Sequence, residues 1–189
     1  MSRTEDLAEL IAAIGACQRC GLAAGRKHTV PGEGAVPAKL MFIGEGPGAR
    51  EDELGRPFVG RSGALLDRLI EEEFGFGREN CYIANVVKCR PPGNRDPLDD
   101  EVDECSGYLA RQLELVDPVV VVMLGRIAAS RLLQRREPLK ELRGQRFELG
   151  GRRYIPTYHP AAALRGGASV VTEMRVDFAR ARLAMLGAG

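Results

Sequence analysis

The chain has 189 residues, carries 27 basic and 26 acidic side chains, and is 44% hydrophobic. Its net charge of +1 argues against a uniformly basic protein that coats nucleic acid. The most apolar run, residues 119–124, is far shorter than the roughly 20 residues that a membrane-spanning helix needs. The length predicts a single domain over residues 1–189, and the polar, acidic start lacks a secretory signal, so we expect a cytoplasmic protein without membrane contact.

Apolar, β-branched segments alternate with helical patterns along the chain. In order, we expect a helix at 7–14, a strand at 39–44, a helix at 65–70, a strand at 81–87, a helix at 102–115, a strand at 119–124, a helix at 125–133, a hairpin turn at 148–153, a strand at 154–158 and a helix at 173–186. This alternation predicts an α/β fold with a mostly parallel sheet of four strands, covered by helices on both faces.

Three of the four predicted strands end in polar or glycine-rich segments, which are GEGPG at 44–48, NVVKC at 85–89 and TYHP at 157–160. Because the carboxyl ends of parallel strands meet at one edge of a sheet, these segments predict a single binding site. The glycine-rich segment is not a dinucleotide fingerprint, since Ala49 stands where a third glycine is needed, and no Gly-Lys-Ser/Thr follows to make a P-loop.

Five cysteines in a cytoplasmic chain are not expected to form disulfides. Cys17 and Cys20 form a C-x2-C pair, Cys89 follows the second predicted strand, and Cys105 lies in the next helix. Cys81, inside a strand, reads as a small buried thiol. For the other four, the spacing leaves three interpretations open: a zinc site, a [4Fe–4S] cluster, or inert core residues.

Four features of the sequence occur in an order typical of one protein family. They are the blocks GEGPGAREDELGRPFVGRSGALLD at 44–67, NVVKCRPPGNRDP at 85–97 and YHPAAALR at 158–165, and the four cysteines 17, 20, 89 and 105. Together they resemble the family-4 uracil-DNA glycosylases, the iron–sulfur branch of that superfamily. The resemblance implies a three-layer α/β/α sandwich with a four-stranded parallel sheet, a [4Fe–4S] cluster on Cys17, Cys20, Cys89 and Cys105, and release of uracil from DNA.

The resemblance also implies roles for residues that would hold the base. Excision requires a base turned out of the strand, a stacking surface and a group that reads the base edge. Asn85 stands at the position of the reader: its amide would donate to uracil O4 and accept from N3–H, a pattern that cytosine reverses. Phe58 matches the aromatic residue that stacks on the base, an interaction that binds a base without discriminating between bases. Glu51 matches a residue near uracil C5, where it would exclude the methyl group of thymine.

Two further residues are implied to act on the glycosidic bond. His159 would donate to uracil O2, where negative charge grows as the bond breaks. Glu45 would position or activate the water that attacks the sugar C1′, and the backbone of Gly46 would touch the uracil edge.

A third group of residues is implied to contact DNA. Leu164 would act as an apolar plug in the duplex and Arg165 would bind a phosphate. Arg61, Lys88 and Arg90 are further candidates for phosphate contacts. Residues 126–165 contain ten basic and three acidic side chains, and we expect this arginine-rich stretch to face the duplex.

The predicted function is therefore a monomeric uracil-DNA glycosylase of base excision repair. Its substrate would be single- or double-stranded DNA that contains uracil, and its products free uracil and an abasic site. No lysine in the matched blocks stands as a Schiff-base nucleophile, so we expect no lyase step. Two alternatives are a non-enzymatic iron–sulfur or zinc module that binds nucleic acid, and a superfamily glycosylase that accepts a broader set of deaminated bases.

Overall fold

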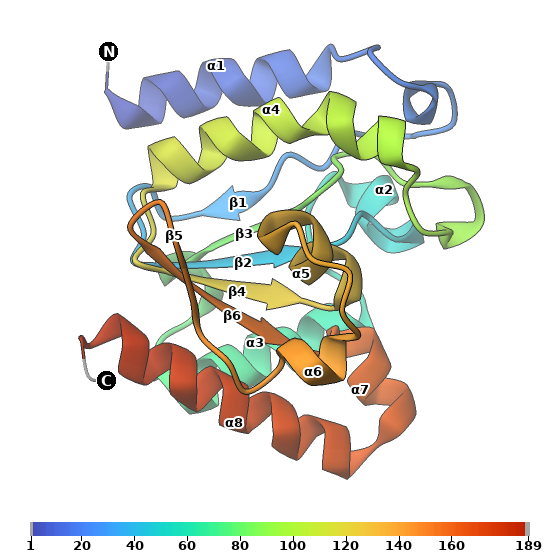
Figure 1. Ribbon diagram of the computed structural model, residues 1–189. Helices are drawn as coiled ribbons and strands as arrows, with labels where there is room; N and C mark the ends of the chain where they lie inside the picture. The colour runs from blue at the N-terminus through green and yellow to red at the C-terminus, as the bar shows by residue number, and fades with distance from the viewer. Residues whose placement is uncertain (1, 188–189) are drawn as a thin grey trace.

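The computed structural model describes residues 2–187, and a mixed six-stranded sheet lies at its centre (Figure 1). The strands stand in the order β1-β3-β2-β4-β6-β5. Their bounds are β1 (Glu33–Gly34), β2 (Leu40–Gly44), β3 (Tyr82–Asn85), β4 (Val120–Leu124), β5 (Phe147–Leu149) and β6 (Arg152–Thr157). The inner strands β3, β2, β4 and β6 run parallel, whereas the edge strands β1 and β5 are antiparallel to β3 and β6.

The predicted α/β class is confirmed, but the prediction of four strands was wrong because both edge strands were missed. β1 has two residues and β5 has three, which is too short for an alternating pattern to be seen in the sequence. The predicted hairpin turn is present between β5 and β6. Gly150 and Gly151 stand there with φ of 56° and 76°, in the left-handed region that favours glycine.

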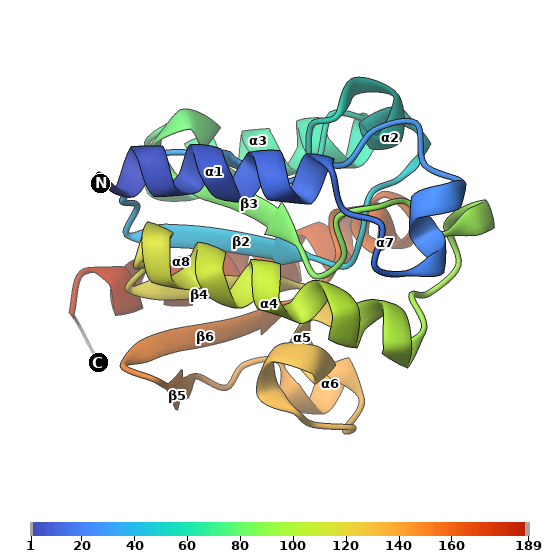
Figure 2. The same ribbon diagram turned by 90° about the horizontal axis from the view of Figure 1, so that it is seen from above.

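Helices cover both faces of the sheet (Figures 1 and 2). One face packs against α1 (Arg3–Gly15), α4 (Asp99–Val116), α5 (Arg126–Leu133) and α6 (Leu139–Leu142), and the other against α3 (Arg61–Phe74), α7 (Pro160–Gly166) and α8 (Ala168–Met185). The remaining helical segments are α2 (Ala49–Leu54) and the 3-10 turns η1 (Gly21–Ala24), η2 (Arg78–Asn80) and η3 (Pro92–Asn94). None of the helices within residues 2–187 is long and apolar enough to cross a bilayer.

Burial explains why β2 and β4 occupy the middle of the sheet. Every residue of both strands is buried, and the strands read LMFIG and VVVML, as expected for strands covered on both faces. Side chains alternate between the faces, so Met41 and Ile43 pack in one apolar cluster while Leu40 and Phe42 pack in the other.

The carboxyl ends of the parallel strands meet at one edge of the sheet. β2 ends at Gly44, β3 at Asn85 and β6 at Thr157, and the polar segments predicted from the sequence follow each of them. In Figure 1 the arrowheads of β2, β4 and β6 point toward the end of the molecule that carries α2 and α7. The sheet thus gathers the three segments in one place.

Candidate active site

A cleft of about 390 Å³ lies at this edge of the sheet. It is lined by Glu45, Gly46, Pro47, Gly48, Glu51, Phe58, Ser62, Asn85, Pro91, Asn94, Arg95, His159, Ala161 and Arg165. The structure therefore brings together all the residues that were predicted to contact uracil or water. Leu164 is not among the lining residues, and the chemical role of each residue stays a prediction.

Asn85 ends β3 and presents a buried amide to the cleft. The residue is 2% exposed, and its Oδ1 has no hydrogen-bond partner among the described residues. A Cβ on Gly44 would lie 2.5 Å from this oxygen, so only glycine leaves room for the amide on the neighbouring strand. A buried acceptor without a donor is costly, and a ligand N–H at this point would satisfy it.

Phe58 forms an aromatic wall of the same cleft, in the loop between α2 and α3. Its φ of 51° is unusual for a residue with a side chain. Arg78 holds this conformation, because its guanidinium donates to the carbonyl oxygens of Phe58 at 2.9 Å and Pro57 at 2.7 Å. A Cβ on Gly63 would lie 1.9 Å from the Phe58 oxygen, so glycine is needed there as well.

Two carboxylates keep Arg78 in place. Its guanidinium pairs with Glu33 at 2.9 Å and with Asp67 at 3.1 Å. Sequence reasoning missed this role of Arg78, since a single arginine in a short turn before a strand carries no pattern that marks it.

Glu51, in α2, is tied to the loop that follows Phe58. Its Oε1 accepts the backbone N–H groups of Val59 at 3.1 Å and Gly60 at 3.4 Å. This carboxylate therefore fastens the loop of the aromatic wall to α2 and at the same time lines the cleft.

His159 is the N-cap of α7 and faces Phe58, with ring centroids 5.5 Å apart and planes inclined by 30°. Its Nδ1 accepts the N–H of Ala161 at 3.1 Å, so the proton of the neutral ring stands on Nε2. Burial lowers the pKa of His159 to about 4, with a contribution from Arg165 and an opposing one from Glu51. At neutral pH the ring is an uncharged donor.

Glu45 follows β2 and is partly buried in the cleft. Burial raises the pKa of this carboxyl, the charge of Asp96 raises it further, and Arg126 opposes the change. A raised pKa makes a carboxylate a stronger base near neutral pH. This is the electrostatic setting expected of a group that takes a proton from water.

The residues predicted to contact DNA do not all reach the surface. Leu164 is 48% exposed on α7, and Arg165 lines the cleft. Arg90 is partly buried, and its Nε donates to Asn94 Oδ1 at 2.8 Å. Lys88, by contrast, is 1% exposed, so the prediction that it contacts phosphate was wrong.

The arginine-rich stretch does not face the cleft as one surface. Residues 126–165 run from α5 through the β5–β6 hairpin to α7, and Arg152 and Arg153 begin β6 at the edge of the sheet opposite the cleft. Arg143 pairs with buried Asp177 at 2.8 Å. The expectation that this stretch meets the duplex as a unit was wrong, because charge density in the sequence does not say which end of a strand an arginine occupies.

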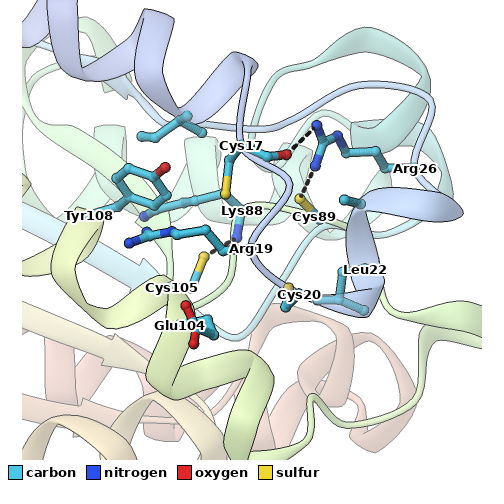
Figure 3. A pocket seen from close by; sticks show the side chains of 12 residues that line it. Cys17, Arg19, Cys20, Leu22, Arg26, Lys88, Cys89, Glu104, Cys105 and Tyr108 are labelled. Carbon is cyan, nitrogen blue, oxygen red and sulfur yellow. Dashed lines mark hydrogen bonds between the residues drawn. The ribbon is translucent and has the colours of Figure 1, made fainter.

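The four cysteines 17, 20, 89 and 105 line a second cavity on the side of α1 and α4 (Figure 3). Arg26 donates to Cys89 Sγ at 3.4 Å, and the backbone N–H of Lys88 donates to Cys105 Sγ at 3.3 Å. Within residues 2–187, no group of three or more His, Cys, Asp or Glu side chains is arranged to hold a metal ion. The donor set nevertheless fits an iron–sulfur cluster in kind, since four thiols surround one space and two of them accept N–H groups.

Cys81 lies apart from this cavity. It packs in the apolar cluster of the other face, donates to the Arg78 carbonyl at 3.2 Å, and burial raises its pKa to about 12. Its burial agrees with the small core thiol expected from the sequence, although Cys81 directly precedes β3 and does not lie inside the strand.

Comparison with known proteins identifies the family to which the chain belongs. Residues 31–183 match the model of the Uracil DNA glycosylase superfamily. The chain is 49% identical over 156 residues to a type-4 uracil-DNA glycosylase of Saccharolobus solfataricus, covering 78% of this chain and 72% of that protein. It is 43% identical over 168 residues to the type-4 uracil-DNA glycosylase of Thermotoga maritima, covering 87% of both.

A solved structure shares the fold. The solution structure of a putative uracil DNA glycosylase from Methanosarcina acetivorans superposes with a TM-score of 0.53 at 15% identity, over 82% of this chain and 97% of that one. At this identity the likeness concerns the fold alone. On the family model and the identities to the two relatives, this chain belongs to the uracil-DNA glycosylase superfamily and, within it, to the type-4 family.

Proposed function

We propose that the protein removes uracil from DNA by hydrolysing the N-glycosidic bond of a deoxyuridine turned out of its strand. The observation that carries the proposal is the presence, in one cleft, of a buried amide and a neutral imidazole with its proton on Nε2. Asn85 supplies the first and His159 the second. Excision needs both a reader of the base edge and a donor for the charge that develops on the base.

Recognition follows from the chemistry of the cleft walls. The Asn85 amide accepts from uracil N3–H and donates to O4, while Phe58 stacks on the ring. Cytosine would direct its amino group at the NH2 of the Asn85 amide and its N3 acceptor at the amide oxygen. Both groups of the buried amide would then be left without a hydrogen bond. Glu51 lies near C5 and leaves no room for the thymine methyl group, and the Gly46 backbone contacts the uracil edge.

The reaction then breaks one bond and forms another. The C1′–N1 bond breaks with its electron pair going to uracil, and negative charge appears on O2. His159 Nε2–H donates to that oxygen, and the hydrogen bond strengthens as the charge grows. A water oxygen bonds to C1′, Glu45 accepts its proton, and uracil N1 is protonated from solvent.

The DNA lies across the carboxyl edge of the sheet in this proposal. Leu164, exposed on α7, enters the space that the base has left, and Arg165 binds a phosphate next to it. In this proposal the chain acts as a monomer and forms one domain over residues 1–189. A single sheet that carries an apolar cluster on each face supports the one-domain part. The absence of a disulfide among the five cysteines, all of which lie within the described residues, suits a reducing cytoplasm, which is the location we propose.

Cys17, Cys20, Cys89 and Cys105 would hold a [4Fe–4S] cluster. The support is the donor set, four thiols around one cavity with N–H groups directed at two of them, together with the membership of the type-4 family. When bound, the cluster would supply cross-links between the end of α1 and the segments that carry Cys89 and Cys105. Purified protein should show broad visible absorption and bound iron, and stoichiometric zinc in a colourless protein would contradict this part of the proposal.

The activity is tested with a uracil-containing single strand and the purified protein. We expect free uracil and an alkali-labile abasic site, and a large loss of turnover in Asn85→Ala and His159→Ala variants that keep the fold. A nucleic-acid-binding module would release no uracil and keep its DNA affinity in both variants. Parallel substrates with hypoxanthine, or with thymine opposite guanine, identify a glycosylase of broader specificity.

A further inference from the structure

Lys88 lies between the cleft and the cysteine cavity and has no part in the reaction proposed above. It follows β3 by three residues, precedes Cys89, and is among the largest fully buried side chains of the protein. Figure 3 shows it among the residues that line the cysteine cavity. A buried lysine is rare, and the groups that its ammonium binds indicate its task.

The Lys88 ammonium binds two neutral oxygens. Nζ donates to the backbone carbonyl of Asn85 and to Gln112 Oε1, both at 2.6 Å. Gln112 in α4 is itself fully buried, and its Nε2 donates to the Pro31 carbonyl at 2.6 Å and to the Tyr82 hydroxyl at 3.1 Å. The Gln112 amide thus accepts from the ammonium through its oxygen, while its nitrogen is held by two other hydrogen bonds.

The Asn85 carbonyl depends on this donor because of where β3 ends. The Val86 N–H donates to the Gly44 carbonyl on β2. The Asn85 carbonyl belongs to the same peptide and points the opposite way, so it faces the side of β1. Within the described residues, β1 pairs only with Tyr82 and Ile83 of β3 and does not extend to Asn85. The Lys88 ammonium takes the place of a strand N–H at this position.

The backbone of the same lysine reaches the cysteine cavity. Its N–H donates to Cys105 Sγ at 3.3 Å, and its carbonyl accepts the Val30 N–H at 2.7 Å. One residue therefore contacts Cys105 with its main chain and Asn85 with its side chain.

We propose that Lys88 is a positioning residue for base recognition, whose ammonium fixes the last peptide of β3 and so sets the direction of the Asn85 amide. Through its backbone contact with Cys105 it links the cysteine cavity to the base pocket. The inference depends on the proposed role of Asn85 as the reader of uracil. It replaces the phosphate contact that the sequence had suggested for this lysine.

A double-mutant cycle tests the inference, because a residue that acts only through Asn85 has no effect once the Asn85 amide is gone. Lys88→Met keeps an unbranched side chain, shorter by one atom, and removes the donor. We expect kcat/KM on a uracil-containing single strand to fall about 10- to 100-fold, the usual cost of losing a hydrogen bond from a charged group. In the Asn85→Ala background the same substitution should change kcat/KM by less than about 2-fold.

Matched variants separate positioning from a general loss of structure. Lys39→Met, at an exposed side chain just before β2 and at the strand end away from the cleft, should leave kcat/KM unchanged. The iron content and visible absorption of each variant are compared with those of the parent. If Lys88→Met does not fold, Lys88→Arg takes its place in the cycle, because it keeps a cation there while moving its donors. We again expect a loss of kcat/KM that disappears in the Asn85→Ala background.

Equal losses in the two backgrounds would overturn the inference and leave the proposed function intact. Wild-type levels of excision in the Asn85→Ala variant would instead overturn the role of Asn85 in the proposed function, and the positioning role of Lys88 with it. The two failures are therefore distinguishable in one set of assays.

Discussion

The two walls of the cleft are held in place by different forces. Arg78 fixes the Phe58 wall from near the protein surface. The Arg78 side chain is 18% exposed and is held by ion pairs with Glu33 and Asp67. Lys88 and Gln112 fix the Asn85 wall from inside, with both side chains almost fully buried and the ammonium bound to neutral oxygens. One wall depends on charge pairs near solvent and the other on a buried hydrogen-bond network.

The difference matches what each wall has to do. Stacking tolerates small displacements and reads no sequence, whereas a hydrogen bond weakens steeply with angle and distance. The residue that recognises the base edge therefore needs a rigid position. The end of β3 provides one, because buried side chains hold it by hydrogen bonds. Ion pairs near the surface contribute about 0–1 kcal/mol and are screened by salt, which is sufficient for a stacking platform.

The largest effect is expected at the Asn85 wall. Asn85→Ala leaves the N3–H and O4 groups of a bound uracil without partners, at about 1–3 kcal/mol each, so kcat/KM should fall about 100- to 10,000-fold. Single-turnover release of uracil from a labelled strand measures it. Asn80→Ala, an exposed asparagine in η2, is the matched control. A loss below about tenfold would mean that the base is not read at this wall.

A smaller effect is expected at the Phe58 wall. Phe58→Leu keeps an apolar side chain and removes the stacking face, worth about 1–3 kcal/mol per base, so we expect a loss of about 10- to 100-fold. The ratio of rates on uracil and on other deaminated bases should stay constant, because stacking does not discriminate between them. Phe147→Leu, in edge strand β5, serves as the control, and a changed ratio would show that Phe58 also takes part in base choice.

The pH dependence of the reaction distinguishes the two groups that act between the walls. Glu45 must be ionised to accept a proton, and its pKa is raised by burial, so activity should fall on acidification, starting above the usual pH range of a glutamate. His159, whose pKa is lowered to about 4, stays neutral through this fall. We expect kcat/KM to drop about tenfold per pH unit below the Glu45 pKa.

Glu45→Gln should remove this acid limb as well as lowering the rate. An acid limb near the ordinary histidine pKa that persists in Glu45→Gln and disappears in a His159 variant would contradict the assignment. It would mean that the imidazole loses its donor role by becoming charged in the working enzyme.

The sequence contained enough to locate the site but not to explain its support. Asn85 ends one recognisable strand, and Glu45 and His159 follow two others. Parallel strands bring their carboxyl ends together, so the convergence of the three residues could be predicted. The residues that hold the walls carry no such signal. Lys88 stands in a turn with Arg90 and looks like a surface cation, and only the packing of α4 over it reveals that it is buried.

Elements at the borders of the fold were hardest to predict, for the same reason. β1 and β5 are defined by their pairing with β3 and β6 rather than by their own side chains. Long-range contacts also determine where the cations of the arginine-rich stretch lie. Arg152 starts β6 and Arg165 lies beyond the end of that strand, so the two side chains stand at opposite ends of the sheet. The apolar pattern of a segment predicts that it forms a strand, whereas the pairing of strands in the folded sheet determines which segments become its neighbours.

The smallest effect is expected from loosening the Phe58 wall without touching its ring. Arg78→Gln removes most of the donors that hold the Phe58 and Pro57 carbonyls, so the left-handed backbone at Phe58 should relax and uracil affinity should fall about 2- to 10-fold. Inhibition by free uracil is the right measurement, because this neutral ligand avoids the salt dependence of phosphate binding. Arg68→Gln, exposed on α3, is the control.

Salt then separates the forces that hold the two walls. Raising the salt concentration screens the pairs of Arg78 with Glu33 and Asp67, so the inhibition constant of uracil should rise in the wild type and stay nearly flat in Arg78→Gln. The buried Lys88 network is screened much less, so Lys88→Met should retain the salt dependence of the wild type. A flat wild-type profile would break the comparison, because it would mean that the close fit of Gly63 against the Phe58 backbone, rather than charge, holds the aromatic wall.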